Sequence, residues 1–176
     1  GAERIASERG YSILLSSTGE DVSREVEVLH MLDERYVDGV IVCGFREEDE
    51  PLHQALSQFQ AVVLVNRQLE GESYPAVLVD DVLGGYLMTR HLLDEGHTAV
   101  GFLAGPANSF SGVCRLLGYQ QALAEAGIEP QTGWAKNCVP TYIHGQEAAR
   151  QLIETHPELS AIFCYNDLVA LGALRG

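Results

Sequence analysis

The sequence predicts an α/β protein built from two lobes, each a doubly wound parallel sheet. Amphipathic helical segments alternate with short apolar runs along all 176 residues. Runs such as residues 39–43 and 161–164 lack polar alternation, which is typical of parallel strands buried on both faces. The alternation restarts at Asp80, so we expect an N-terminal lobe at residues 1–79 and a C-terminal lobe at residues 80–176.

The first series begins with a helix near residues 2–9, which is expected to stop at Gly10. Val22, Val26, Leu29 and Leu32 recur at helical spacing and predict a second helix. A third helix is expected at residues 52–59. Apolar, β-branched runs predict strands at residues 11–16, 39–43, 61–65 and 76–79.

The second series repeats this pattern. Helices are expected at residues 82–95, ending at Gly96, and at residues 112–126, with Gly127 as the left-handed stop residue. A further helix at residues 146–155 precedes Pro157, and a last helix opens at Asn166. Strands are expected at residues 99–103, 134–139 and 161–164.

The charge balance excludes nucleic-acid binding by these residues themselves. The net charge is −14, from 25 acidic and 11 basic residues, with a local acidic run at residues 46–50. Such a surface repels phosphate backbones. No apolar run has the length of a membrane span, so no membrane contact is expected. Residues 1–4 resemble the interior of a helix, so we expect the natural chain to extend further upstream.

The four cysteines, Cys43, Cys114, Cys138 and Cys164, share no CxxC spacing. Cys43 and Cys164 end apolar runs, which favours free buried thiols in a reducing cytoplasm over a disulfide framework. A cytoplasmic location is therefore expected.

Signatures of several enzyme classes are absent. The sequence has no GxGxxG, no GxxxxGK[ST] and no GxSxG motif, and its six histidines show no paired metal spacing. We therefore expect no catalytic residue, no metal site and no cofactor.

Polar residues stand out at three places in the sequence. Asp80 and Asp81 are interpreted as helix caps, with a catalytic or metal-binding carboxylate pair as the alternative. Asn166, followed by Asp167, stands where a strand gives way to a helix, and it either caps the helix or offers a donor and an acceptor to a ligand. Arg115 near a helix start is either a surface residue or a guanidinium directed into a cleft, and in either case little stability should depend on it.

Seven segments together carry a resemblance to a known family. They are VDGVIV at 37–42, VLVNR at 63–67, VDD at 79–81 followed by Gly84 and Gly85, HLLDEGH at 91–97, VGFLAGP at 100–106, RLLGYQQAL at 115–123 and YNDLVALGAL at 165–174. In this order and at these spacings, the chain closely resembles the effector-binding core of lactose/galactose-repressor transcriptional regulators.

The resemblance implies a periplasmic-binding-protein-like fold, with a sugar or related metabolite bound between the lobes and allosteric control of operator binding. It also implies a homodimer and an upstream helix-turn-helix that contacts DNA. By position, Arg115 and Asn166 match effector-binding residues, Asn66 matches a polar position at the end of a first-lobe strand, and Tyr142 is a candidate for stacking on the ligand. The helix at residues 1–9 and the segment after Cys43 match dimer surfaces of the family.

The chain also departs from the family pattern. Its first core strand is not among these residues, and in a flavodoxin-like order it would lie between the strands at 11–16 and 39–43. We expect that position to be filled by another segment or the lobe to be distorted. Elements after Gly176 are also lacking, including an acidic ligand contact, so both lobes are expected to be incomplete. Val113 and Cys114 are less polar than the pattern suggests.

Two other functions fit the same fold class. A secreted sugar-binding protein of a transport system would carry a signal peptide upstream and be monomeric. An α/β enzyme would carry a phosphate loop or an activated nucleophile.

Overall fold

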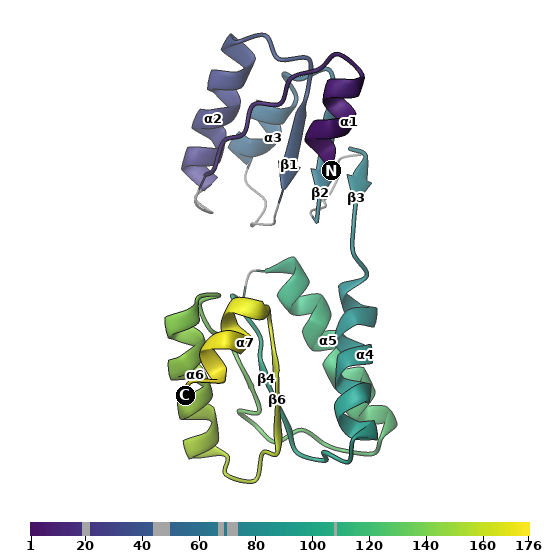
Figure 1. Ribbon diagram of the computed structural model, residues 1–176, viewed down its shortest axis with the longest axis vertical. Helices are drawn as coiled ribbons and strands as arrows, with labels where there is room; N and C mark the ends of the chain where they lie inside the picture. The colour runs from purple at the N-terminus through teal and green to yellow at the C-terminus, as the bar shows by residue number, and fades with distance from the viewer. Residues whose placement is uncertain (19–21, 44–49, 67–68, 70–73, 108) are drawn as a thin grey trace.

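The computed structural model describes residues 1–18, 22–43, 50–66, 69, 74–107 and 109–176. Its strands form two separate three-stranded sheets, one from strands within residues 40–77 and one from strands within residues 100–164. All strand pairs are parallel. Figure 1 shows the two sheets in separate halves joined by the chain between β3 and α4. The predicted α/β architecture with two parallel sheets is confirmed.

The first sheet has the strand order β1-β2-β3, with β1 at Val40–Cys43, β2 at Val62–Val65 and β3 at Ala76–Val77. The helices of this half are α1 (Ala2–Glu8), α2 (Val22–Glu34) and α3 (Glu50–Leu56). One core joins the sheet to α2 and α3, and its buried residues are Leu29, Val40, Val42, Leu52, Ala55, Leu56, Val62, Leu64 and Leu69.

The other face of the first sheet is less covered. Burial alternates along β1, where Val40 and Val42 are buried while Ile41 is 61% exposed. Helix α1 has no buried residue. Burial on both faces, which the apolar run predicted, therefore does not hold for β1.

The strand predicted at residues 11–16 does not form. These residues adopt no regular structure, and Tyr11, Ile13, Leu14 and Leu15 are exposed. A strand requires a neighbour that completes its backbone hydrogen bonds, and an apolar pattern cannot supply one. Among the described residues, β1 pairs with β2 alone.

The second sheet has the order β5-β4-β6, with β4 (Val100–Leu103) between β5 (Ala135–Lys136) and β6 (Ala161–Cys164). Its helices are α4 (Asp81–Asp94), α5 (Phe110–Glu125), α6 (Tyr142–Thr155) and α7 (Asp167–Ala173). In Figure 1, α4 and α5 lie on one side of the sheet and α6 and α7 on the other. All four residues of β4 are buried, as predicted for a central strand.

Separate cores hold these helices on the two faces. On one face, the ring of Phe102 stacks on Phe163 with centroids 4.5 Å apart, and Tyr119 of α5 packs 5.5 Å away. The buried Tyr119 hydroxyl donates to the carbonyl of Val100 at 2.7 Å. On the other face, Leu103 packs with the buried residues Ala148, Ala149, Leu152 and Val169.

Glycines end three helices as predicted. Gly10, Gly96 and Gly127 follow α1, α4 and α5 with φ of 79°, 94° and 70°. Helix α6 begins at Tyr142, four residues before the predicted start, because Thr141 caps it.

The helix pairs on the second sheet cross at closely packed glycines. A Cβ atom at Gly85 of α4 would lie 2.2 Å from the carbonyl oxygen of Arg115, and one at Gly118 of α5 would lie 2.0 Å from that of Val82. Gly145 and Gly172 have the same role between α6 and α7. Because the α4–α5 crossing involves the backbone of Arg115, it also fixes where that residue lies.

All four cysteines are free, but none is fully buried as predicted: Cys43 is exposed, and Cys114, Cys138 and Cys164 are partly buried. Cys43 belongs to the alternating strand β1 and points to the less covered face. Most of the acidic run at 46–50, and the predicted dimer surface after Cys43, lie outside the described residues. Within the described ranges, none of the helices has the length and apolar character of a membrane span.

Candidate functional site

The carboxyl edge of the second sheet gathers the polar positions that the sequence singled out. Strands β4, β5 and β6 end at this edge, and the chain continues from them into α5, α6 and α7. Helix α4 also begins there (Figure 1). Ligands of open parallel sheets bind at this kind of edge.

The side chain of the N-cap residue caps each helix that begins at this edge. Asp80 Oδ1 accepts from the amide of Leu83 at 2.9 Å, and Ser109 Oγ accepts from the amide of Gly112 at 3.2 Å. Thr141 and Asn166 cap α6 and α7 in the same way. Each cap therefore gives a partner to one of the backbone donors at the start of its helix.

Arg115 lies in the second turn of α5 and is held on two sides. Its Nε and Nη2 lie 2.8 and 2.7 Å from the same oxygen, Oδ1 of Asp81. Its Nη1 donates to the carbonyl of Tyr165. The side chain is 28% exposed, against 6% for Asp81, so Arg115 is neither a free surface residue nor fully buried.

Asp80 and Asp81 have different roles, although both were predicted as caps. Asp80 is the N-cap of α4. Asp81 lies in the first turn, is buried and pairs with Arg115. This ion pair joins α4 to α5 across the closely packed glycines.

Tyr165 connects the end of β6 to the same cluster. Its ring lies beneath the guanidinium, with the Arg115 Cζ atom 5.2 Å from the ring centroid. Its hydroxyl lies 2.9 Å from Ser109 Oγ. Gly105, with φ of 50°, makes room for the ring, because a Cβ atom there would lie 2.5 Å from it.

Asn166 can serve both roles that the sequence left open. Its Oδ1 accepts from the amide of Val169 at 2.9 Å and caps α7. Its amide nitrogen makes no hydrogen bond within the described part of the chain. The partly buried side chain can therefore cap the helix and still donate to a ligand.

The other two candidate residues do not join this cluster. Asn66 follows β2 in the first half, is exposed and has a left-handed φ of 51°, which asparagine tolerates better than most residues. Tyr142 is the first residue of α6 and is exposed. No hydrogen bond links either side chain to Arg115 or Asn166 in the described ranges. In Figure 1 the carboxyl end of β2, which precedes Asn66, is directed toward the second half.

The thiols beside the cluster are electrically neutral at neutral pH. Burial raises the pKa of Cys164 to about 11. The pKa of Cys114, next to Arg115, is raised by burial and by the charges of Asp81 and Asp80. No group of three or more potential metal ligands occurs in the described part of the chain.

Sequence reasoning missed Asp81, Tyr165 and Ser109 as members of the cluster. Only one of two adjacent carboxylates can be an N-cap, which was a signal that Asp81 needed another partner. The contacts of Tyr165 and Ser109 join positions 56 residues apart and carried no local signal.

The chain matches, over residues 1–176, the family described as periplasmic binding proteins and the sugar binding domain of the LacI family. The HTH-type transcriptional regulator GalR of Escherichia coli (strain K12) is 30% identical over 172 residues, which cover 98% of this chain and 50% of GalR. The repressor PurR of Shigella sonnei (strain Ss046) is 28% identical over 176 residues, covering 98% and 51%. The chain thus spans about half the length of these curated relatives.

Solved structures agree with this match. The transcription regulator CcpA of Lactococcus lactis superposes with a TM-score of 0.87 at 30% identity, over 97% of this chain and 62% of that one. The complex of the transcriptional regulator CelR with cellobiose gives a TM-score of 0.83 at 31% identity, over 96% and 52%.

Proposed function

Because the chain belongs to the family of periplasmic binding proteins and LacI-family sugar-binding domains, we propose that it is the effector-sensing part of a DNA-binding transcriptional regulator. The relatives named above are transcriptional regulators rather than enzymes or transport proteins, which favours this function over a secreted binding protein. Operator DNA would be contacted by a helix-turn-helix outside these residues.

The observation that carries the proposal is the anchored guanidinium of Arg115. Asp81 and the Tyr165 carbonyl fix its orientation at the carboxyl edge of the second sheet. A preorganised donor loses little conformational entropy when a ligand binds, so it suits recognition of hydroxyl groups. Asn166 adds a donor from the start of α7, and Tyr142 offers a ring at the start of α6.

We propose that the ligand lies between two lobes, residues 1–79 and 80–176, with Asn66 facing it from the first. The two sheets have separate cores, and the chain passes between them just before α4. A ligand that contacts both lobes would favour one arrangement of them and so shift the population that is competent for DNA binding.

The test uses the natural full-length protein. DNA fragments that it binds are selected from its own genome, and the affinity for a selected fragment is measured with and without each sugar of a panel. At least one sugar should change this affinity about fivefold or more, the lower range of allosteric coupling. A protein that selects no DNA, or whose DNA affinity no panel member changes, would contradict the proposal.

A further inference from the structure

Helices α4 and α5 expose apolar side chains on their solvent side. Leu83 and Leu87 of α4 and Val113 and Leu117 of α5 are each between 47% and 56% exposed. The members of each pair are four residues apart, so their side chains lie on one face of the helix. A helix that packs on a sheet normally carries polar residues at such outward positions. We call these four residues the α4–α5 outer face.

The two helices pack closely, so these side chains belong to one layer. A Cβ atom at Gly118 of α5 would overlap the backbone of Val82 and Tyr86 on α4. The Tyr86 hydroxyl donates to Glu125 Oε2 at 2.7 Å, from α4 to α5. Figure 1 shows the two helices on the same side of the sheet. Apolar side chains in rows on adjacent helices are typical of surfaces that bind an amphipathic helix.

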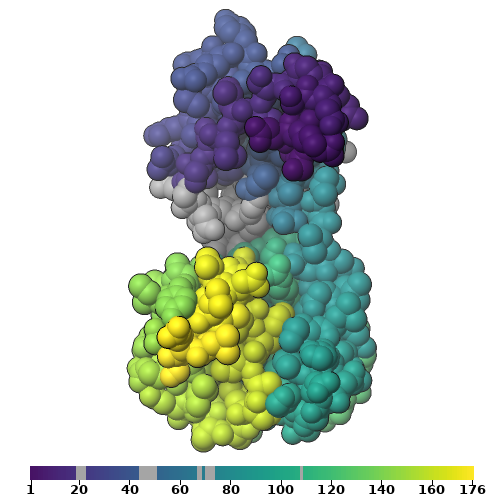
Figure 2. Space-filling model, viewed as in Figure 1, coloured from purple at the N-terminus to yellow at the C-terminus, as the bar shows by residue number. Residues whose placement is uncertain are grey.

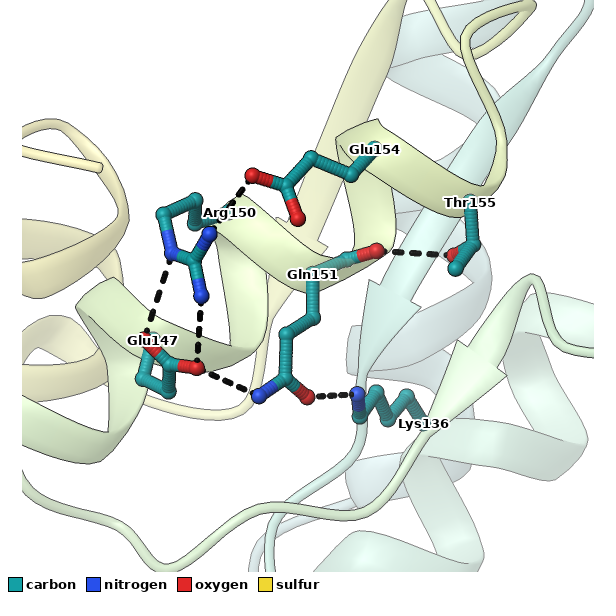
Figure 3. Close-up of polar contacts among 6 residues, drawn as sticks. All are labelled: Lys136, Glu147, Arg150, Gln151, Glu154 and Thr155. Carbon is teal, nitrogen blue, oxygen red and sulfur yellow. Dashed lines mark hydrogen bonds and ion pairs between the residues drawn. The ribbon is translucent and has the colours of Figure 1, made fainter.

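The exposed face of α6, on the other side of the sheet, has a different character. Arg150 lies between Glu147 and Glu154. Gln151 donates to Glu147 and accepts from Lys136, as Figure 3 shows. Polar side chains that pair with one another along a helix are typical of a face exposed to water. The α4–α5 outer face carries leucines and a valine instead, which favours a protein partner over water.

Carboxylates dominate the charge around the outer face. The exposed carboxylates on these two helices and at their ends are those of Asp80, Asp94, Glu95 and Glu125. Both arginines of the two helices are paired, Arg90 with Asp94 and Arg115 with Asp81. Neither helix contains a lysine. The outer face is therefore an apolar surface with an acidic border.

This acidic border restricts what can cover the surface. In a contact with a second copy of the chain, two acidic borders would meet, and like charges at an interface oppose association. The anionic surface of a membrane would be repelled for the same reason. A partner whose apolar residues are flanked by lysine or arginine would be attracted, and the net charge of −14 would speed the encounter.

We propose that the α4–α5 outer face binds a basic amphipathic helix of another protein. The helix places an apolar stripe against the two leucine-containing rows and its lysines or arginines beside the acidic border. Arg115 and Asn166 take no part in this surface, so the inference is independent of the proposed effector site.

The test begins with photo-crosslinking in the cells that produce the natural full-length protein. A photoreactive phenylalanine analogue replaces Leu87, and in a control protein it replaces Ile153, a comparably exposed residue of α6. The peptides joined to the analogue are sequenced. At position 87, but not at position 153, we expect a segment of another protein that has apolar residues at helical spacing and lysine or arginine beside them.

The segment found in this way is then synthesised, and its affinity for the full-length protein is measured by fluorescence anisotropy. Leu87→Gln and Leu117→Gln should each weaken binding about tenfold, because each removes apolar area from the contact. Ile153→Gln is the matched control and should leave the affinity unchanged. Replacing the lysines and arginines of the peptide by glutamine should also weaken binding, and so should a higher salt concentration.

The crosslinked product decides which occupant covers the surface. A lipid, a second copy of the chain or another segment of the same chain joined at position 87 would overturn the inference, as would equal crosslinking at positions 87 and 153. A captured segment that is acidic or lacks an apolar stripe would also overturn it. Equal affinities of Leu87→Gln and Ile153→Gln for the peptide would have the same consequence.

Discussion

At the scale of single residues, Arg115 has a structural role as well as the proposed binding role. Removing it would leave the buried Asp81 carboxylate without its partner, which costs about 1–3 kcal/mol at a partly exposed pair. In contrast to the expectation from the sequence, we therefore predict that Arg115→Ala lowers stability measurably. Lysine, which keeps the charge but loses the planar fork, is the better probe of ligand recognition.

Asn166 permits a separation of its two roles. Asn166→Asp keeps the oxygen that caps α7 but loses the amide donor, so ligand affinity should fall about 3- to 10-fold while the melting temperature stays the same. Asn166→Ala should in addition cost about 1 kcal/mol of stability as a lost cap. Calorimetry measures the ligand affinity of both variants, and thermal unfolding measures their stability. Unchanged affinity in both would show that Asn166 is only a cap.

At the scale of elements, the α4–α5 crossing holds the site together, and two adjacent glycines test it. A methyl group at Gly85 would overlap the backbone of Arg115, so Gly85→Ala should destabilise the protein by about 1–3 kcal/mol and weaken ligand binding. Gly84 has open space around it, so Gly84→Ala should stabilise by about 0.5–1 kcal/mol through helix propensity. Urea unfolding measures the free energy of unfolding of both variants. Equal changes in the two would contradict the close packing of α4 against α5 at Gly85.

Sequence patterns located most elements because local chemistry determines them. Gly127 and Pro157 mark helix ends, and the apolar run at residues 161–164 corresponds to β6 residue for residue. The prediction of a strand at residues 11–16 was wrong, because a strand depends on a neighbouring strand that no local pattern reveals. Likewise, the positions of Arg115 and Asn166 could be predicted, whereas the link from Arg115 to Asp81 depends on how two helices pack.

At the scale of the whole molecule, apolar surface remains uncovered. On α7 the side chains of Leu168, Leu171 and Leu174 are exposed, and Ile143 of the adjoining α6 is also exposed. Figure 2 shows α7 at the surface of the second half. Exposed leucines of this kind mark a surface that further elements of the lobe, expected after Gly176, or another protein would cover.

The dimer surfaces that the resemblance implies lie elsewhere, so we expect the full-length protein to be a homodimer that uses α1 and the segment after Cys43. Ile5→Glu at an exposed position of α1 should weaken the dimer about tenfold or more, because it would bury a charge in an apolar contact. Gln120→Glu adds the same charge at an exposed position of α5 and should have no effect. Sedimentation equilibrium measures both, and a protein that stays monomeric at high micromolar concentration would contradict the dimer.

We propose that the carboxyl edge around Arg115 senses a small ligand. The most direct measurement is the calorimetric affinity of the full-length protein for the sugar that the panel identifies, in Arg115→Lys and in Arg90→Lys, a matched change at an exposed ion pair of α4. Arg115→Lys should bind about tenfold more weakly or worse, because lysine cannot reproduce the anchored fork, and Arg90→Lys should bind as the unsubstituted protein does. Equal affinities in the two variants would contradict the claim.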